Sequence, residues 1–461
     1  CPIGQATACE LYRVNLSAGD RVKRTAYVIP DASIAEMLRR SSATRLFSGV
    51  QADFRGLLRA GSEMELPVHG DLFRSARTTL LAHCDSDAVA SSFPRDSVLA
   101  VQETVPVLGA LNRLGFGRRV ARILQTWVRK QKRSGAWGQQ EGSPAATGQI
   151  LWAILDHVRL TGNERLLSRF YPVISKAGAW LESSQKDGVL SGRGGNGVGR
   201  WEAIWACAGL RESAKAASKL KKSRDADRWI RAHGEMLEVL RDRFGDKAIS
   251  AVFDRPMDSG AVAVLSAVWP LNLLSAREAS VQKTLSWLES NSVANGAFFA
   301  EGMPSGFSPS RTAHLAQTCL MAGLDGVTER LDALARDASP TGSWPSAYLL
   351  SGQGVGREGD HAWAAAEFVM LQRNLILWEE GGVLHLFKGT DKRWWDGRTL
   401  LRDVPTRFGH VDLDLEDGCL RLDGRWRQKP SRVIWYKPEG EKGTLVVDGS
   451  RKSSKKAELA L

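Results

Sequence analysis

A long series of helical patterns constrains the fold more than any other feature of this 461-residue chain. From about Asp71 to about Glu379, apolar residues recur with the spacing of three to four residues that is typical of helices. The pattern predicts about twelve helices, near residues 72–83, 97–114, 117–132, 146–161, 164–184, 201–220, 224–244, 258–274, 280–290, 309–323, 325–338 and 361–378.

The connections between these helices alternate in length. Tight links such as 115–117 and 161–163 alternate with long Gly/Pro-rich loops at 134–145, 187–199, 294–308 and 339–360. Long loops in a compact domain usually carry function. The alternation implies helical hairpins whose long loops gather on one face, and six such hairpins close into a toroid. The predicted fold class is therefore mainly α, an (α/α)6 barrel over residues 71–380.

The two ends of the chain have different patterns. Residues 1–70 are mixed, with short strands near 12–16 and 25–29 and a polar helical stretch near 34–48, and we interpret them as a linker or a remnant of an N-terminal β domain. After residue 380, short alternating runs bounded by Gly, Asp and Pro predict a small C-terminal antiparallel β domain over 381–449, followed by a charged tail at 450–461.

Composition excludes several classes. The net charge is +12, but Lys and Arg are spread through the chain without a nucleic-acid-binding signature, so we expect a solvated basic surface and no nucleic-acid partner. No apolar run reaches the roughly 18 residues of a membrane span. No signal peptide is visible. Because the chain starts at a Cys, we interpret it either as a fragment or as a processed lipoprotein, and the sequence does not predict the compartment.

We expect neither a metal nor a cofactor. The six cysteines are scattered, with no CxxC pair and no Cys/His metal spacing. Two segments fit G-x-G-x-x-G, at 192–197 and 354–359, but neither follows a long buried strand in a βαβ unit. We interpret these glycines as positions that let loop backbone turn tightly or approach a ligand.

One candidate acid lies between two tryptophans near the middle of the chain. Glu202 falls in the first turn of a predicted helix, with Trp201 before it and Trp205 one turn later. A first-turn Glu often serves only the free backbone N–H groups and the helix dipole. The alternative is a carboxylic acid at the rim of a tryptophan-lined pocket, as sugar chemistry requires.

Other candidate residues lie on or beside the long loops. Arg95 and Asp96 precede the second helix, where they either cap it or form a donor and acceptor pair for adjacent sugar hydroxyls. A second set of candidates for substrate binding comprises Trp137, Glu141, His361 and Trp363, and Glu358 is a candidate for catalysis. Glu358 is either a helix cap or a second carboxylate that faces Glu202 across a pocket.

These segments resemble the six-hairpin glycosidases, the (α/α)6-barrel group that includes glucoamylases, trehalases and α-L-rhamnosidases. Arg95-Asp96-Ser97 looks like the Arg-Asp pair that binds the terminal sugar, and Trp201-Glu202 looks like the family's Trp-Glu motif. The segments 344–345, 358–367 and 384–409 resemble the last barrel helix and the sheet after it. The likeness spans roughly 70–440 and implies that an N-terminal β-sandwich domain is absent or partly represented.

The resemblance implies an inverting glycoside hydrolase with an oligosaccharide or polysaccharide substrate. Glu202 would be the general acid, Glu358 the base with Glu141 in reserve, and Arg95, Asp96 and the tryptophans would hold the sugar. Two departures favour an alternative, a carbohydrate-binding protein that has lost catalysis: Ser346 and Ala145 stand where related sequences often carry an acid. A helical platform for protein interactions is the third hypothesis.

Overall fold

The computed structural model describes residues 43–84, 88–89, 101–138, 142–190, 199–302, 305–350, 354–356, 359–453 and 458–460. The chain divides into two units, residues 1–58 and residues 59–461. Helix α2 (Ala43–Arg59) accounts for the described part of the first unit. The strands that we predicted near 12–16 and 25–29 lie outside the described residues.

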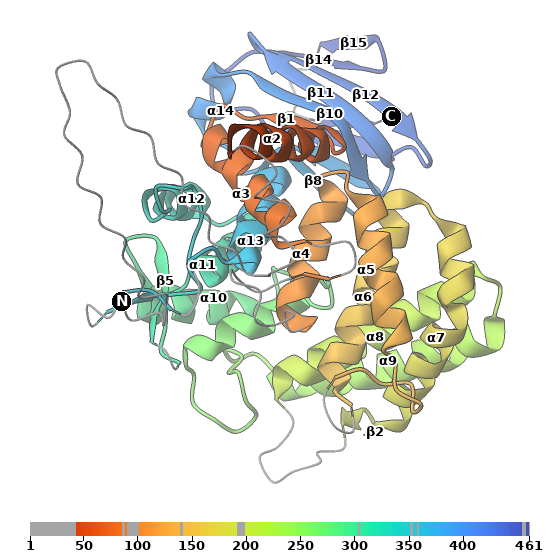
Figure 1. Ribbon diagram of the computed structural model, residues 1–461. Coiled ribbons are helices and arrows are strands. Elements are labelled where there is room, and N and C mark those ends of the chain that lie inside the picture. Colours follow the sequence, from red (N-terminus) through yellow and green to blue (C-terminus); the bar gives the residue numbers. More distant parts are fainter. Residues whose placement is uncertain are drawn as a thin grey trace, which may run out of the picture. The chain divides into compact units, whose positions relative to one another are not determined.

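The helices of the second unit alternate between an inner and an outer position. The inner segments are α4 (Val101–Arg113), α6 (Pro144–Thr161), α8 (Arg200–Lys219), the 3₁₀-helix η1 (Ser259–Ala267), α11 (Pro309–Ala322) and α13 (Ala362–Ile376). The outer helices are α3 (Gly70–His83), α5 (Gly117–Arg129), α7 (Glu164–Ser183), α9 (Ser223–Phe244), α10 (Ala279–Ser292) and α12 (Val327–Arg336). Each inner segment contacts the next, and α13 contacts α4, which closes the ring. The described helices therefore confirm the predicted (α/α)6 toroid (Figure 1).

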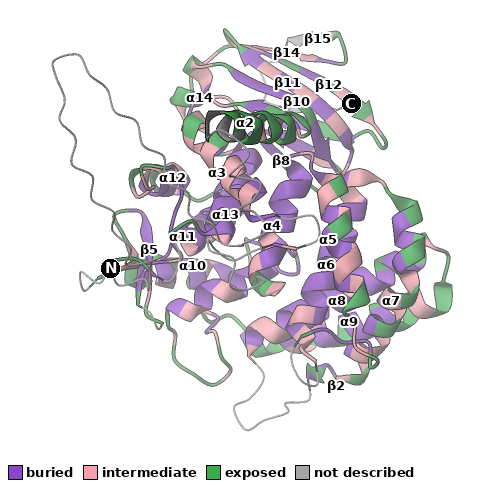
Figure 2. Cartoon of the chain, viewed as in Figure 1, coloured by how far each residue is buried: buried purple, intermediate pink, exposed green. Residues whose placement is uncertain are grey.

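Burial distinguishes the two sets of helices. The inner helices α6, α8 and α13 are buried on nearly all sides, including polar residues such as Gln372 and Arg373. The outer helices α5 and α9 bury one apolar stripe and expose a charged face (Figure 2). None of the described helices is both long and apolar enough to cross a membrane.

One inner segment differs from its prediction. The pattern at 258–274 predicts an α-helix, but the structure has a 3₁₀-helix over 259–267. Its flanking backbone bonds, from Ala261 N to Asp258 O and from Val268 N to Leu265 O, span three residues. Gly260 and the β-branched valines of this segment disfavour a regular α-helix, whereas short 3₁₀ pieces tolerate them.

Two sheets are formed mainly by the chain that follows α13, and one of them also includes β1 (Glu63–Glu65), which precedes α3. Strands β1, β10 (Thr399–Thr406), β11 (Gly409–Glu416), β12 (Cys419–Trp426), β14 (Thr444–Val447) and β15 (Ser450–Ser453) form a six-stranded sheet in that order. Strands β16 (Glu458–Ala460), β13 (Arg432–Trp435), β9 (Val383–Leu386) and β8 (Leu377–Glu380) form a second sheet. The short helix α14 (Lys392–Asp396) lies between β9 and β10 in the chain.

These sheets differ from the prediction in three respects. The β12–β14 and β13–β9 pairs are parallel rather than antiparallel. Strand β1 pairs with β10, so residues 63–65 belong to the β part rather than to a separate N-terminal segment. Residues 450–453 and 458–460, predicted as a charged tail, are strands.

Short strands occupy parts of the long loops. Strands β2 (Gln185–Lys186) and β3 (Val189–Leu190) form a hairpin after α7. Strands β4 (Val293–Ala294), β5 (Ala297–Ala300), β6 (Gly306–Phe307) and β7 (Tyr348–Leu349) form a sheet from the loops before α11 and α13. These loops, like those before α6 and α8, lead into the N-termini of inner helices.

Candidate functional site

A cavity of about 330 Å³ opens at the N-terminal ends of the inner helices. All six inner segments contribute to it, mostly through residues in their first halves. Residues that line it are Gln102, Val105, Pro106, Gln149, Trp152, Trp201, Trp205, Val262, Ala263, Ser266, Trp269, Pro270, Arg311, His314, Trp363, Glu367 and Met370. Because the long loops lead into these helix ends, the cavity lies on the face where the sequence predicts the functional loops to gather.

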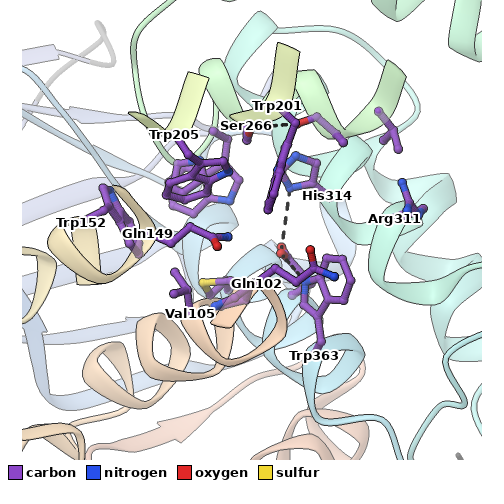
Figure 3. Close-up of a pocket in the computed structure, with 17 residues that line it drawn as sticks. Gln102, Val105, Gln149, Trp152, Trp201, Trp205, Ser266, Arg311, His314 and Trp363 are labelled. Atoms are coloured by element: carbon purple, nitrogen blue, oxygen red, sulfur yellow. Dashed lines mark hydrogen bonds and ion pairs between the residues drawn. The ribbon is translucent and has the colours of Figure 1, made fainter. Parts of the chain in front are cut away.

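Five tryptophans dominate the walls of this cavity. Figure 3 shows Trp201 and Trp205 pointing into it from α8. Trp205 meets Trp152 of α6 edge to face, with ring centroids 6.1 Å apart. Flat aromatic faces with a few polar groups between them suit the apolar faces and hydroxyl rims of sugar rings. Of the predicted contact residues, Trp201, Trp205 and Trp363 line the cavity.

Helix packing sets the position of Trp205. A Cβ atom at Gly148 of α6 would lie 1.9 Å from the backbone oxygen of Trp205. Only glycine therefore allows α6 and α8 to approach this closely. The same approach places Gln149 of α6 beside the tryptophans of α8 (Figure 3).

Glu367 supplies the one carboxyl group among the described residues that line the cavity. Its side chain is 5% exposed, and Oε1 accepts a hydrogen bond from the indole N–H of Trp363 at 3.1 Å. Burial raises the pKa of Glu367 to about 7, against the opposing effect of that hydrogen bond. Oε2 has no hydrogen-bond partner in the part of the chain that the structure describes. The group is thus a buried carboxylic acid that is substantially protonated at neutral pH.

Two basic residues from α11 complete this side of the cavity. His314 Nδ1 lies 3.9 Å from Glu367 Oε1, too far for a hydrogen bond. Burial and the neighbouring Arg311 lower the pKa of His314 to about 4, so the imidazole is neutral at pH 7. Arg311 forms no ion pair with any residue that the structure describes, and burial lowers its pKa. The cavity therefore contains one acid, one neutral imidazole and one cation.

Glu202 lies next to the cavity wall rather than in it. It belongs to the first turn of α8, and its neighbour Trp201 lines the cavity, whereas Glu202 does not. The side chain is half-buried, and burial raises its pKa. No capping hydrogen bond from its side chain is present in the described structure.

The remaining predicted residues divide into two groups. Arg95, Asp96, Glu141 and Glu358 lie outside the described residues. Trp137 and His361 are described and buried, but neither lines the cavity. The indole N–H of Trp137 donates to Trp127 O at 2.8 Å, and the indole N–H of Trp344 donates to Leu334 O at 2.8 Å. Each of these hydrogen bonds connects a long loop to the outer helix that precedes it.

His361 precedes α13 as its N-cap residue. Its backbone N–H donates to Trp344 O at 2.6 Å, and its ring lies beside that of Trp363, with centroids 6.1 Å apart. Burial and the nearby His83 lower its pKa to about 4. His361 therefore supports the tryptophan that lines the cavity.

Four polar cavity residues have no role predicted from the sequence: Glu367, His314, Arg311 and Gln149. For Glu367 a signal exists: it is the one charged residue in the run 362–371, and a charge inside an otherwise apolar helix suggests a buried functional group. Within the described ranges, no cluster of His, Cys, Asp or Glu could hold a metal ion.

Comparisons with known proteins support the fold. No family model matches the chain, and no curated protein matches its sequence. Solved structures match with a TM-score of 0.64 for a rhamnosidase of Bacillus sp. GL1, at 17% identity, covering 86% of this chain and 44% of that one. A bacterial glucoamylase complexed with acarbose matches with a TM-score of 0.56, at 12% identity, over 74% of this chain and 60% of that one. A protein described as a wild-type glycosidase matches with a TM-score of 0.56, at 13% identity, over 66% and 96%. The chain thus has the six-hairpin glycosidase fold.

Proposed function

We propose that this chain is a glycoside hydrolase that cleaves an oligosaccharide or polysaccharide in the tryptophan-lined cavity. The observation that carries the proposal is the position of Glu367, a buried carboxyl group of raised pKa in a wall of tryptophans. A general acid for glycoside cleavage needs such a group, since it must hold a proton near neutral pH. The names of the similar structures, a rhamnosidase, a glucoamylase and a glycosidase, support the same class of reaction.

Glu367 is suited to donate a proton from one defined oxygen. Because Oε1 accepts the Trp363 N–H, the proton of the neutral acid belongs on Oε2. Oε2 has almost no accessible surface in the described structure, so the proposed step requires the Glu367 side chain to turn this oxygen toward the cavity. Oε2 then protonates the glycosidic oxygen while the bond from that oxygen to the anomeric carbon breaks. A water molecule attacks the anomeric carbon and gives its proton to a second carboxylate.

Glu202 and Glu358 are the candidates for that second carboxylate. Glu202 is half-buried beside Trp201, and Glu358 precedes α13 in the chain. The competing assignment keeps Glu202 as the acid and Glu358 as the base, with Glu141 in reserve. An inverting mechanism places the two carboxyl groups about 6.5–9.5 Å apart.

The proposed sugar contacts combine flat and polar surfaces. Trp201 and Trp363 are half-buried and can stack on a sugar ring, while Gln149 and Arg311 offer N–H donors to hydroxyl groups. Arg95 and Asp96, in the segment before α4, remain proposed contacts for the terminal sugar.

A second candidate function is sugar binding without cleavage. It is favoured by the finding that Glu367 is the one Asp or Glu side chain among the described cavity residues, because hydrolysis needs two. Ser346 and Ala145, where related sequences often carry an acid, point the same way.

A reducing-sugar release screen distinguishes the two functions. The panel holds α-glucans, rhamnosides and anionic polysaccharides, and the variants are Glu367→Gln, Glu202→Gln and, as a matched control, Glu238→Gln on the exposed face of α9. Hydrolysis predicts release by the wild type and the control, and a loss of about a hundredfold or more in Glu367→Gln. Calorimetric binding to a panel member with no release by any protein would instead establish the binding function.

A further inference from the structure

A second cavity, of about 280 Å³, lies at the C-terminal ends of the inner helices. Residues from α4, α6, α8, α13, β8 and the β10–β11 turn line it. Trp152, Trp269 and Pro270 line both cavities, so they form the floor between them. The two cavities differ in chemistry, because the second is walled mainly by charged side chains.

Basic side chains outnumber acidic ones around this second cavity. The six basic residues are Arg113, Arg159, Arg211, Lys215, Arg373 and Arg407, and the three acidic residues are Asp156, Glu212 and Glu379. This leaves a formal surplus of three positive charges. The negative ends of the inner helix dipoles offset part of the surplus.

Each acidic residue is already paired. Asp156 accepts two hydrogen bonds from Arg113, at 2.9 and 3.2 Å. Glu212 contacts Arg159 at 2.5 Å, Arg211 at 3.0 Å and Lys215 at 3.3 Å. Glu379 contacts Arg373 at 2.5 Å. The carboxylates are therefore saturated by cations that lie beside them.

Arg407 is different, since it forms no ion pair with any residue that the structure describes. It projects from the turn between β10 and β11, and its guanidinium lies over the Phe408 ring, 5.0 Å from the centroid. Its Nη2 atom is buried and lacks an acceptor among the described residues. Three more residues that line the cavity carry a buried donor with this property, at Arg113 Nε, Arg373 Nε and Trp378 Nε1.

Buried donors, above all those on cations, are costly unless an acceptor meets them. Three such donors are on Arg113, Arg373 and Arg407 and a fourth is on the neutral indole of Trp378, and all four residues border one cavity that already carries surplus positive charge. Arginine forks match the oxygen atoms of phosphate and sulfate groups. We propose that this cavity is a binding site for a small oxyanion of the phosphate or sulfate class, either free or as a group on a small molecule.

The geometry limits what such a ligand can be. A volume near 280 Å³ holds an oxyanion with a small attached group or with water, but no long chain. Lys215 is 52% exposed and Arg159 is 32% exposed, so these two side chains mark the open side of the cavity. Arg373, 2% exposed, marks its closed side.

The test uses isothermal titration calorimetry of the full chain with inorganic phosphate and with sulfate, at fixed ionic strength set by chloride. The wild type is expected to show saturable binding with one site per chain. Arg407→Gln is expected to bind about tenfold more weakly or worse, because it loses a charge-assisted contact. Arg407→Lys, which keeps the charge and not the fork, is expected to lie between the two.

Two controls make the result decisive. Arg402→Gln removes an exposed arginine on β10 that does not line the cavity, so it is expected to bind like the wild type. Glu367→Gln is also expected to bind phosphate unchanged, which separates this site from the sugar cavity. If Arg407→Gln does not fold, Lys215→Gln at the open side replaces it, again with weaker binding expected. No saturable binding by the wild type, or equal affinity in the Arg407 and Arg402 variants, would overturn the proposal.

Discussion

The indole N–H of Trp363 donates a hydrogen bond to Oε1 of Glu367 at 3.1 Å, one turn further along α13. This contact links a tryptophan that lines the cavity to the carboxyl group that we propose as the acid. It leaves Oε2 as the oxygen that can hold and donate the proton. One helix therefore carries both the proposed stacking residue, Trp363, and the proposed proton donor, Glu367.

Activity is expected to fall as pH rises through about 7. The general acid must be protonated, and the pKa of Glu367 is raised to about 7 by burial. A profile of kcat/KM against pH in the wild type should show this basic limb. A basic limb that persists unchanged in the residual activity of Glu367→Gln would assign the proton to another group.

Stability should depend on pH through the same residue. The pKa of Glu367 is about 7 in the folded protein and 4.5 as its ordinary value, so the folded state binds the proton more tightly. The free energy of unfolding should therefore fall as pH rises from about 4.5 to about 7, by about 3 kcal/mol in total.

Urea unfolding of the wild type and Glu367→Gln at pH 5 and pH 8 measures this dependence. The stability difference between the two proteins should shift in favour of Glu367→Gln at pH 8. An identical pH dependence in both proteins would show that the carboxyl group is not protonated by burial.

Glu212 holds three cations at the C-terminal ends of the helices. It is fully buried; burial alone would raise its pKa, but Arg159, Arg211 and Lys215 outweigh burial and lower it to about 2. Glu212→Gln should destabilise the protein by about 3 kcal/mol, the low end for a broken buried ion pair, because Arg211 is largely buried while Arg159 and Lys215 are partly exposed. Chemical denaturation checks this against Glu238→Gln, which should change stability by less than about 0.5 kcal/mol. A loss below about 1 kcal/mol in Glu212→Gln would contradict the account.

Gly148→Ala should destabilise the ring. Its new Cβ would lie 1.9 Å from Trp205 O, so α6 and α8 would have to separate. We expect this to lower the free energy of unfolding by about 3 kcal/mol. Gly234→Ala on α9 is the matched control, since its Cβ would meet nothing within 4 Å. The free energy of unfolding of that control should rise by up to about 1 kcal/mol, because Ala has a higher helix propensity than Gly. Equal stability of the two variants, measured by thermal unfolding, would mean that the close approach of α6 and α8 is not required.

The helical part of the fold was largely predictable because its signal is local. Apolar spacing identified every described helix from α3 to α13, and alternating loop lengths indicated the hairpins. The segment at 258–274 was predicted as α-helix, because periodicity alone does not separate a 3₁₀-helix from an α-helix. Strand β10 was not predicted, since Pro405 and the irregular register between Leu401 and Val404 obscure its alternation.

The site was less predictable than the fold. Trp201, Trp205 and Trp363 were expected near a pocket because they flank long loops. Glu367 was not, since its importance depends on ring closure, which brings α13 against α11 and α4. The pairing of β1 with β10 likewise joins residues far apart in the sequence, which no local pattern reveals.

The central claim is that a sugar binds in the cavity with its scissile bond at Glu367. The most direct measurement is a crystal structure of Glu367→Gln soaked with the panel oligosaccharide that the wild type cleaves or binds. We expect a sugar ring against Trp201 or Trp363, with a glycosidic oxygen within roughly 2.7–3.2 Å of the residue 367 amide. A sugar bound elsewhere on the molecule, with this cavity holding none, would contradict it.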